Sequence, residues 1–391
     1  MNLRLGDDLI IPGKLMSKKG ENIYKRKDGR WEGRYIRYLD PNNKAKFGYV
    51  YGKSYSEVKQ KLIEKKNEVL KNPDLTSKKR ITYNELLNTW LAVSKINTKE
   101  STYARYAHLI NTHIRPYLGE YQLVNITTQV IEDFVEQQLV NGRLDNNGGL
   151  SPKTVTDMLT VIKNTIEYAR YKDLTIVCNL TKLSVKRKDK EMRVLSHSEQ
   201  SALVRVLLNE TDLYKFGVLL SLYTGIRVGE LCALQWQDMN LSTGTLVVRK
   251  TMQRIQNTDN ETDKKTKVIV TEPKSQCSIR EIPLPSFIID IAKQFSSYPD
   301  AFVLSGNSNL FTEPRTMQNR FRTYVIESGI AATNFHALRH TFATRCVEVG
   351  FELKSLSEVL GHANVNITLN RYVHSSFELK SLNMNKLSLC F

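Results

Sequence analysis

The stretch HALRHTFATR, at residues 336–345, carries side chains whose spacing could support chemistry. His336 and His340 lie four residues apart, and Arg339 precedes the second histidine. Two histidines four residues apart on a helix can bind zinc, whereas His and Arg three residues apart share a helix face that can hold a phosphate. Zinc proteases need Glu directly after the first histidine, and Ala337 occupies that position here. A phosphate site or an ordinary polar helix is therefore favoured over a metal site.

Three further segments of the same region add polar side chains. TGIRVGE places Arg227 after a glycine turn, with Glu230 three residues further along the same helix face. PKSQCSIREIPL puts Lys274 on a turn between two predicted strands, and LGHANVNITLNRY supplies His362 and, ten residues later, Tyr372. Each residue alone has an ordinary alternative, such as a salt-bridged arginine, a solvated lysine or one of 18 tyrosines. Their combination in one region favours a shared site.

This set of residue types suits the metal-free transfer of a DNA phosphoryl group to a tyrosine. Attack on a phosphodiester builds negative charge on its non-bridging oxygens, which two arginines can clamp with paired N–H donors. Losing one such donor usually raises the barrier by roughly 3–4 kcal/mol. A tyrosine hydroxyl needs a base and positive surroundings, and a histidine can take its proton. A lysine can protonate the departing 5′ oxygen, and the phosphotyrosyl ester preserves the bond energy for religation without ATP.

The charge balance points to a polyanionic partner. Among 391 residues, 57 Lys and Arg stand against 40 Asp and Glu, a formal net charge of +17, which favours nucleic acid over a merely solvated basic surface. The five cysteines are scattered without a C-x-x-C pair, which argues against disulfides and a cysteine-based metal site. No segment approaches the ~18 consecutive apolar residues of a membrane span, and the N-terminus lacks the order of a signal peptide. We expect a cytoplasmic protein.

The elements that must position these residues fall into three blocks, which together predict a multidomain α+β fold. Residues 20–72 predict a small sheet followed by an amphipathic helix, because aromatic runs are broken by the turn signals KDGR and DPNNK. Basic and aromatic side chains interleave along this sheet, which fits either a basic rim or a sheet that enters a DNA groove. The candidate DNA contacts in this block are Arg30, Arg34, Arg37 and Lys46.

The second block, residues 81–173, predicts four or five helices. Thr82 and Glu85 can form a capping box, and Ser151 followed by Pro152 is typical of a helix start. A charged linker then leads to the third block at about Leu195, where helices surround strand-like segments and the polar set described above. The candidate DNA contacts in the helical block are Lys99, Thr102, Tyr103 and Lys153.

In these motifs the chain resembles the tyrosine recombinases, the phage-integrase family of site-specific DNA recombinases. TGIRVGELCALQW is similar to the family's first arginine box, and HALRHTFATR with LGHANVNITLNRY is similar to its second box. The first block resembles the three-stranded arm-type DNA-binding domain of integrases from conjugative transposons. The resemblance implies an arm-binding domain at residues 1–75, a helical, SAM-like core-binding domain at 80–180, a linker at 181–194, and a mainly helical catalytic domain with a small antiparallel sheet at 195–391.

The resemblance implies roles for the residues that handle the phosphate. Tyr372 would be the nucleophile that forms a 3′-phosphotyrosyl link, while Arg227 and Arg339 would hold the scissile phosphate. Lys274 would be the general acid for the 5′ oxygen, because PKSQCSIREIPL keeps the family's spacing from the lysine to the next strand. The long loop RIQNTDNETDKKTKV leaves three lysines in competition for that role, namely Lys264, Lys265 and Lys267.

The resemblance implies supporting roles for the remaining polar residues. His336 would act as acid and base toward the nucleophile, and His362 would hydrogen-bond the phosphate. Glu230 would support the first arginine, and His340 would support the shape of the site. No metal ion, ATP or other cofactor is implied.

The resemblance implies an enzyme that integrates and excises a mobile genetic element. Its implied partners are double-stranded attachment sites of core and arm type, other copies of the chain in a tetramer, an excisionase-type directionality factor and a host DNA-bending protein. Its implied location is the bacterial nucleoid, with no membrane. Two alternatives stay open: a type IB topoisomerase, which shares the chemistry without pairing two sites, and a catalytically silent DNA-binding regulator, which would not need the complete set.

Overall fold

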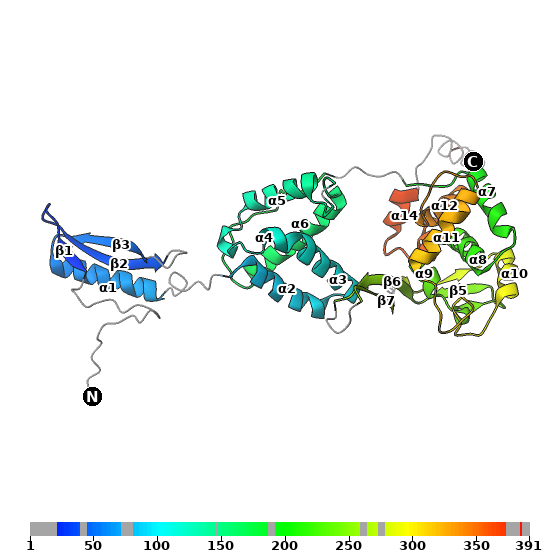
Figure 1. Cartoon of the computed structure of the whole chain (residues 1–391), viewed down its shortest axis with the longest axis horizontal. Helices are drawn as coiled ribbons and strands as arrows, with labels where there is room; N and C mark the ends of the chain where they lie inside the picture. Colours follow the sequence, from blue (N-terminus) through cyan, green and yellow to red (C-terminus); the bar gives the residue numbers. More distant parts are fainter. Residues whose placement is uncertain are drawn as a thin grey trace, which may run out of the picture. The chain divides into compact units, whose positions relative to one another are not determined.

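The computed structural model describes residues 22–39, 45–71, 81–145, 147–186, 192–258, 264–272, 278–372 and 384 (Figure 1). Helices and three small sheets in these ranges confirm the predicted mixed α+β fold. No helix among them combines the length and apolar character needed to cross a membrane. The chain divides into two compact units: one holds the described residues up to Trp90 with Arg115–Glu136 and Ile162–Lys182, and the other holds Leu91–Ile114, Gln137–Val161 and the described residues from Leu183 onward.

The first unit begins with an antiparallel sheet in the order β1-β2-β3, and a helix lies across one of its faces (Figure 1). The next segment contains the predicted helices together with two short irregular turns. The bounds of the sheet and its helix are β1 (Ile23–Lys25), β2 (Trp31–Leu39), β3 (Ala45–Gly52) and α1 (Tyr55–Lys71). The helical segment contains α2 (Tyr83–Asn97), α3 (Glu100–Leu109), the π-helical η2 (Ile110–Ile114), α4 (Arg115–Leu118), the 3₁₀-helical η3 (Leu123–Asn125), α5 (Thr128–Asn141) and α6 (Pro152–Tyr171).

Two glycines explain the geometry of the N-terminal sheet. Gly29 has a φ of +83°, a conformation that glycine adopts without strain, so the predicted turn between β1 and β2 is confirmed. Gly33 faces α1, where an added side chain would lie within 3 Å of Leu62 and Val58. Because position 33 has no side chain, those two residues of α1 pack directly onto the sheet, and both are buried.

The predicted helix starts of the second block are confirmed. The backbone N–H of Thr82 donates to the Glu85 carboxylate at 2.8 Å, and the Glu85 N–H donates to the Thr82 hydroxyl at 3.3 Å, which is the capping box. At the start of α6 the Ser151 hydroxyl accepts from the N–H of Thr154 at 3.1 Å. Each bond satisfies a helix-end N–H that has no partner within the helix.

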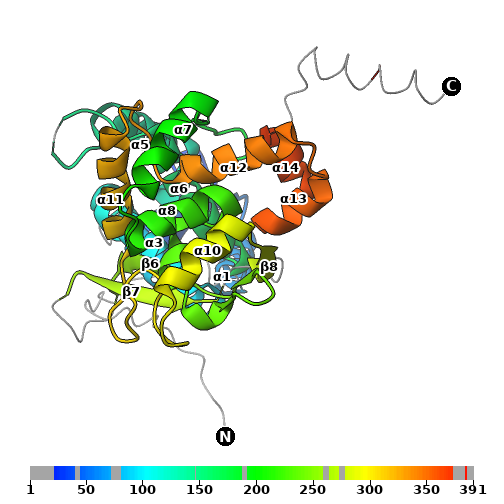
Figure 2. The same cartoon turned by 90° about the vertical axis from the view of Figure 1, so that its right-hand side faces the viewer.

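The C-terminal part of the chain packs its helices around α8, whose residues 216–222 are all buried. Its strands form two separate small sheets, one in the order β4-β5-β8 and one that pairs β6 with β7. The bounds are α7 (His197–Leu208), α8 (Leu213–Thr224), α9 (Val228–Ala233), η4 (Trp236–Asp238), β4 (Met239–Asn240), β5 (Thr245–Val248), β6 (Thr251–Gln256), β7 (Thr266–Thr271), β8 (Arg280–Pro283), α10 (Ser286–Phe295), α11 (Pro314–Glu327), α12 (His336–Glu348), α13 (Leu353–Leu360) and α14 (Val365–Tyr372). Helices α12, α13 and α14 lie next to one another (Figure 2).

Candidate active site

The backbone of the site is formed by the C-terminal turns of two helices. α8 ends at Gly225 with a φ of +67°, and α13 ends at Gly361 with a φ of +64°. Side chains other than glycine adopt this left-handed conformation only with strain. A side chain at position 225 would also lie 2.6 Å from Phe342, so glycine there allows α12 to approach. Arg227 follows the first of these turns after one residue, and His362 directly follows the second.

Glu230 is a buried carboxylate shared by two arginines. Arg227 donates its backbone N–H to one carboxylate oxygen at 2.9 Å and a side-chain N–H to the other at 2.8 Å. Arg280, the first residue of β8, donates two N–H groups at 2.8 and 3.2 Å. Burial alone would raise the pKa of Glu230, but the hydrogen bonds and charge of Arg280, with the charge of Arg227, lower it to about 2. The structure thus places Glu230 against the arginine that it is predicted to support.

Arg339 joins the two glycine turns. Its side chain is buried on α12 and donates to the carbonyl oxygen of Gly225 at 2.8 Å and to that of Leu360 at 2.6 Å. Both carbonyls belong to helix ends, where the last C=O groups have no partner within the helix. A guanidinium that satisfies them is held in one orientation, and it remains cationic because an arginine keeps its proton at neutral pH.

Tyr372, the last residue of α14, is buried against His340. The His340 Nδ1 atom and the tyrosine hydroxyl are 2.9 Å apart. The His336 ring lies beside His340, with 4.5 Å between ring centroids, and it lines the neighbouring pocket. The histidine predicted to support the shape of the site is therefore the one that contacts the tyrosine. Burial raises the pKa of Tyr372, while the charges of Arg339 and other arginines oppose the rise, so the hydroxyl is protonated at neutral pH.

His362 is oriented by a buried threonine. Its Nδ1 atom lies 2.8 Å from the hydroxyl of Thr368, one turn into α14. The imidazole is nearly parallel to the Tyr372 ring, with 6.5 Å between centroids and 4° between planes. A hydrogen bond at one ring nitrogen leaves the other nitrogen for a further partner. The predicted role of a phosphate contact needs that free nitrogen.

The buried histidines of the site make the stability of the fold depend on pH. Burial, with the charges of Arg339 and Arg227, lowers the pKa of His362 to about 4, and burial, with the charge of His340, lowers that of His336 to about 4. Between pH 6.5 and 4 these two histidines take up protons in the unfolded chain but stay neutral in the folded chain. Their contribution to stability therefore falls as the pH falls through this window. We expect the thermal midpoint of the DNA-free protein to drop on acidification from pH 7 to 5.

The substitution His362→Gln should weaken that pH dependence by about 1 kcal/mol after allowance for partial exposure. Differential scanning calorimetry at pH 7, 6 and 5 measures the effect. His197→Gln, at a highly exposed position of α7 in the same unit, is the control for the loss of an imidazole elsewhere on the surface. Equal slopes for wild type and His362→Gln would contradict the prediction.

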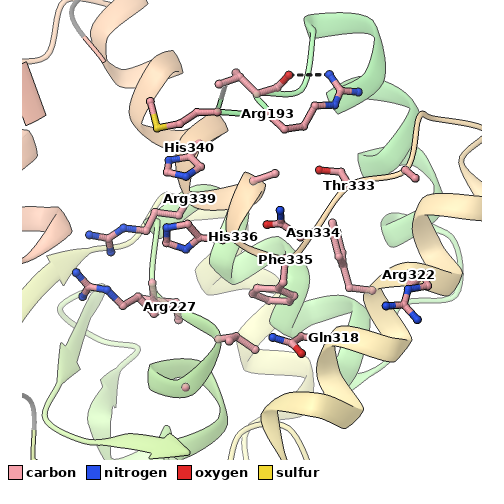
Figure 3. A pocket seen from close by; sticks show the side chains of 18 of the residues that line it. Arg193, Arg227, Gln318, Arg322, Thr333, Asn334, Phe335, His336, Arg339 and His340 are labelled. Atoms are coloured by element: carbon pink, nitrogen blue, oxygen red, sulfur yellow. Dashed lines mark hydrogen bonds between the residues drawn. The ribbon is translucent and has the colours of Figure 1, made fainter. Parts of the chain in front are cut away.

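A pocket of about 1380 Å³ lies beside these residues. Arg227, His336, Arg339 and His340 lie along one side of it, and Gln318 and Arg322 of α11 lie along the other (Figure 3). The described lining residues include no Asp or Glu, and a pocket with this charge suits a phosphate backbone. The arginines that line it are Arg193, Arg227, Arg315, Arg322 and Arg339.

Comparisons with known proteins identify the family. The profile described as Phage integrase family matches residues 193–378, and that described as Phage integrase, N-terminal SAM-like domain matches residues 82–138. The chain belongs to the phage integrase family of tyrosine recombinases. It is 26% identical to a tyrosine recombinase XerC-like protein of Caldanaerobacter subterraneus, over 86% of this chain and 90% of that protein. It is 21% identical to the ICEBs1 integrase of Bacillus subtilis, over 75% of this chain and 79% of that protein.

Solved structures of tyrosine recombinases share the fold. The Tn1549 transposon integrase in complex with a circular intermediate DNA matches with a TM-score of 0.63 at 20% identity, over 78% of this chain and 99% of that chain. A lambda integrase tetramer bound to a Holliday junction matches with a TM-score of 0.53 at 17% identity, over 89% of this chain and 97% of that chain. The family recognised from the sequence motifs is therefore confirmed, as is the fold class.

The predicted general acid of this tyrosine recombinase lies outside the described residues. Lys274 belongs to the segment between β7 and β8 that is left undescribed. Of its three competitors, Lys267 lies on β7 and pairs with Glu100 at 2.6 Å, while Lys264 and Lys265 precede that strand. The assignment of the general acid to Lys274 stays a prediction.

The predicted DNA contacts of the sheet have different surroundings. Arg30 is paired with Asp28 in the turn at 2.8 Å, and the Arg34 guanidinium lies 3.3 Å from the centre of the Phe47 ring. Lys46 is exposed on β3, and the Arg37 side chain lies outside the described residues. A guanidinium stacked on an aromatic ring is held in place for a further contact. Base or phosphate contacts by these residues stay predictions.

The predicted contacts of the helical block cluster at two helix starts. Lys99 is the N-cap residue of α3, and Thr102 and Tyr103 follow in the first turns of the same helix. Lys153 lies in the first turn of α6, where it pairs with Asp157 at 3.1 Å. A helix start favours an anion because its N–H groups and dipole point outward. These four residues also remain predicted DNA contacts.

The sequence analysis did not assign several residues that the structure places at the site. Arg280 and Ile282 are buried on one face of β8, and that period-two pattern could have shown that the arginine points inward. Thr368 had no distinguishing signal. On α11 the spacing of Arg315, Gln318 and Arg322 is i, i+3 and i+7, which marks one helix face and could have predicted a shared surface.

Proposed function

We propose that this tyrosine recombinase cleaves and rejoins DNA at specific sites through a 3′-phosphotyrosyl intermediate, and that it integrates and excises a mobile genetic element. The observation that carries the proposal is the arginine-lined pocket, where Arg227, His336 and Arg339 converge beside the histidine that contacts Tyr372. A duplex phosphate in this pocket would meet two guanidinium groups and a neutral imidazole. Members of the same family supply the precedent for the reaction.

The first half of the proposed reaction forms the covalent link. The Tyr372 oxygen attacks the phosphorus, while Arg227 and Arg339 stabilise the charge that develops on the non-bridging oxygens. The hydroxyl proton passes to a histidine, because both neighbours are neutral at pH 7 and can accept it. His340 touches the hydroxyl in the DNA-free protein, and His336, which faces the pocket, is the proposed acid and base during attack.

The 5′ oxygen leaves as the tyrosine attacks, and religation later restores the phosphodiester. As the new phosphorus–oxygen bond forms, the bond to the 5′ oxygen breaks, and that oxygen takes a proton from the proposed general acid, Lys274. His362 donates to a non-bridging oxygen. Religation runs the same steps in reverse when a 5′ hydroxyl from the partner strand attacks the phosphotyrosine. Neither half requires ATP, because the phosphotyrosyl ester preserves the energy of the broken bond, and neither requires a metal ion, because the two arginines stabilise the developing charge.

The proposed assembly divides the chain into an arm-binding part at residues 1–75, a core-binding part at 80–180, a linker at 181–194 and a catalytic part at 195–391. We propose that four copies act on two core sites, as the lambda integrase tetramer is bound to a Holliday junction. The net charge of +17 supports double-stranded DNA as the partner. An excisionase-type directionality factor and a host DNA-bending protein are proposed from the resemblance to integrases alone.

The function is tested with the DNA ends of the element that encodes the protein. We expect a covalent protein–DNA adduct on a nicked duplex carrying the attachment site, in buffer containing EDTA, and joined products when two sites are present. Relaxation of any supercoiled plasmid without joining would support a type IB topoisomerase instead. Tight, site-specific binding without an adduct would support a silent regulator.

A further inference from the structure

Arg280 connects two parts of the active site that lie far apart in sequence. Its side chain is 5% exposed, and its guanidinium donates two N–H groups to Glu230. A third N–H, on Nε, donates to the carbonyl oxygen of Val359 at 2.6 Å. Val359 lies in the last turn of α13, three residues before His362. One side chain therefore ties the carboxylate behind Arg227 to the turn that carries His362.

The carboxylate at the centre of this arrangement has no spare acceptor capacity. Its two oxygens receive four N–H groups, two from Arg227 and two from Arg280, and a carboxylate offers about four lone-pair sites. Removing Arg280 would therefore leave a buried charge with half of its donors. The same removal would free Arg227 to pivot about its remaining bonds.

The end of α13 is held in the same way from a second direction. Arg339 donates to Leu360, the residue after the one that Arg280 contacts, and also to Gly225 beside Arg227. Gly361 completes the turn, and a side chain there would lie 3.0 Å from the Arg280 side chain. Two arginines thus bind the end of α13. Arg339 ties it to the end of α8, and Arg280 ties it to Glu230 in the first turn of α9.

A need for stability does not account for this buried ion pair. The cost of removing two charges from water often matches their attraction, and apolar residues of similar volume can replace such pairs without loss. An apolar pair, however, has no donors for the Val359 carbonyl and no acceptors for Arg227. The property that requires an arginine at position 280 is the simultaneous fixing of Arg227 and the His362 turn.

We infer that Arg280 is a positioning residue for the cleavage step. Through Glu230 it fixes Arg227, and through Val359 it fixes the turn of His362, so that two groups from separate helix ends meet one scissile phosphate at a set separation. The inference rests on the proposed function. A displacement of about 1 Å in such a group can slow a reaction roughly 100-fold, which sets the size of the effect to expect.

Two variants distinguish the positioning role of Arg280 from its role in balancing the buried charge of Glu230. Arg280→Met leaves the Glu230 charge partly unpaired and should lower both the thermal midpoint and the cleavage rate. In Arg280→Met combined with Glu230→Gln the buried charge is gone, but the amide oxygen of the glutamine still accepts from the backbone of Arg227. We expect the thermal midpoint of the double variant to recover to near that of wild type, whereas single-turnover adduct formation on the nicked duplex stays roughly 100-fold slower. Recovery of the rate together with stability would overturn the inference.

Arg280→Lys and Arg345→Met complete the set of variants. Lysine keeps the charge but not the fork that reaches Glu230 and Val359 together, so it should fold well and still cleave slowly. Arg345 is a half-buried arginine on α12 that also joins a carboxylate, Glu348, to a backbone carbonyl. Arg345→Met should lower stability without a comparable loss of rate in the folded fraction. A loss of rate equal to that of Arg280→Met would mean that the effect is merely structural.

A DNA-free measurement keeps the inference testable if the proposed function fails. The N–H groups of Gly361 and His362 are bonded to the end of α13, and those of Gly350 and Phe351 are bonded in the same way to the end of α12. In the double variant we expect amide hydrogen exchange to accelerate about tenfold at the first pair and to remain unchanged at the second. Unchanged exchange at both pairs would overturn the positioning role. Absence of an adduct with wild type would overturn the proposed function alone.

Discussion

The substitution Tyr372→Phe is expected to abolish the covalent protein–DNA adduct while the protein stays folded. Phenylalanine fills the same buried space beside α12 but has no oxygen to attack phosphorus. The lost hydrogen bond to His340 should lower stability by about 1 kcal/mol. Denaturing electrophoresis of the reaction on a nicked duplex measures the adduct, and thermal unfolding measures the fold.

Tyr324→Phe is the matched control for this loss. Tyr324 is another buried tyrosine, on α11 of the same compact unit, and burial raises its pKa to about 12. The control should form adduct at the rate of wild type. An adduct that persists in Tyr372→Phe would show that another residue is the nucleophile, and mapping of the DNA-bound peptide would then identify it.

The two arginines that are proposed to hold the scissile phosphate, Arg227 and Arg339, are expected to differ in how much stability the protein loses when each is replaced. Arg227→Met should slow cleavage by about 10²–10³-fold, because one clamp on the developing charge is gone. Its effect on stability should be small, since the side chain is 38% exposed and Glu230 keeps its bonds to Arg280. Arg339→Met should slow cleavage at least as much, and should also destabilise the fold by about 2 kcal/mol or more, because two helix-end carbonyls lose their donor.

Single-turnover rates at saturating protein, with denaturant unfolding of the same preparations, separate these outcomes. A nicked substrate with a neutral methylphosphonate at the cleavage position provides a control for charge, because it carries less negative charge for the arginines to stabilise. The penalty of Arg227→Met should shrink on that substrate. Equal loss of stability in both arginine variants would contradict the difference in burial on which the prediction depends.

Local signals in the sequence predicted local structure well. The Asp28-Gly29 turn, the Thr82–Glu85 capping box and the Ser151 cap each depend on a few neighbouring residues, and each was confirmed. The order of the polar motifs also predicted which residues share a site, because Arg227, His336, Arg339 and His362 come together around two helix ends.

Partners that are distant in sequence were harder to predict. Spacing places His336 and His340 on one helix but does not reveal which ring meets Tyr372, since that depends on how α14 packs on α12. The sequence analysis assigned no role to Arg280, although its alternation with Ile282 on β8 is typical of a side chain that points inward. The separation of β6 and β7 from the other sheet depends on strand pairing that the residue pattern leaves open.

The shared carboxylate also determines how the pH dependence of the reaction can be interpreted. Since the pKa of Glu230 is held at about 2, its anchoring of Arg227 does not change anywhere in the range where the protein is folded and active. An acidic limb in a pH–rate profile therefore reports protonation of the histidines rather than release of the arginine clamp. The interaction of Arg227 with Glu230 therefore stays the same while His336, His340 and His362 take up protons at the acidic end of the profile.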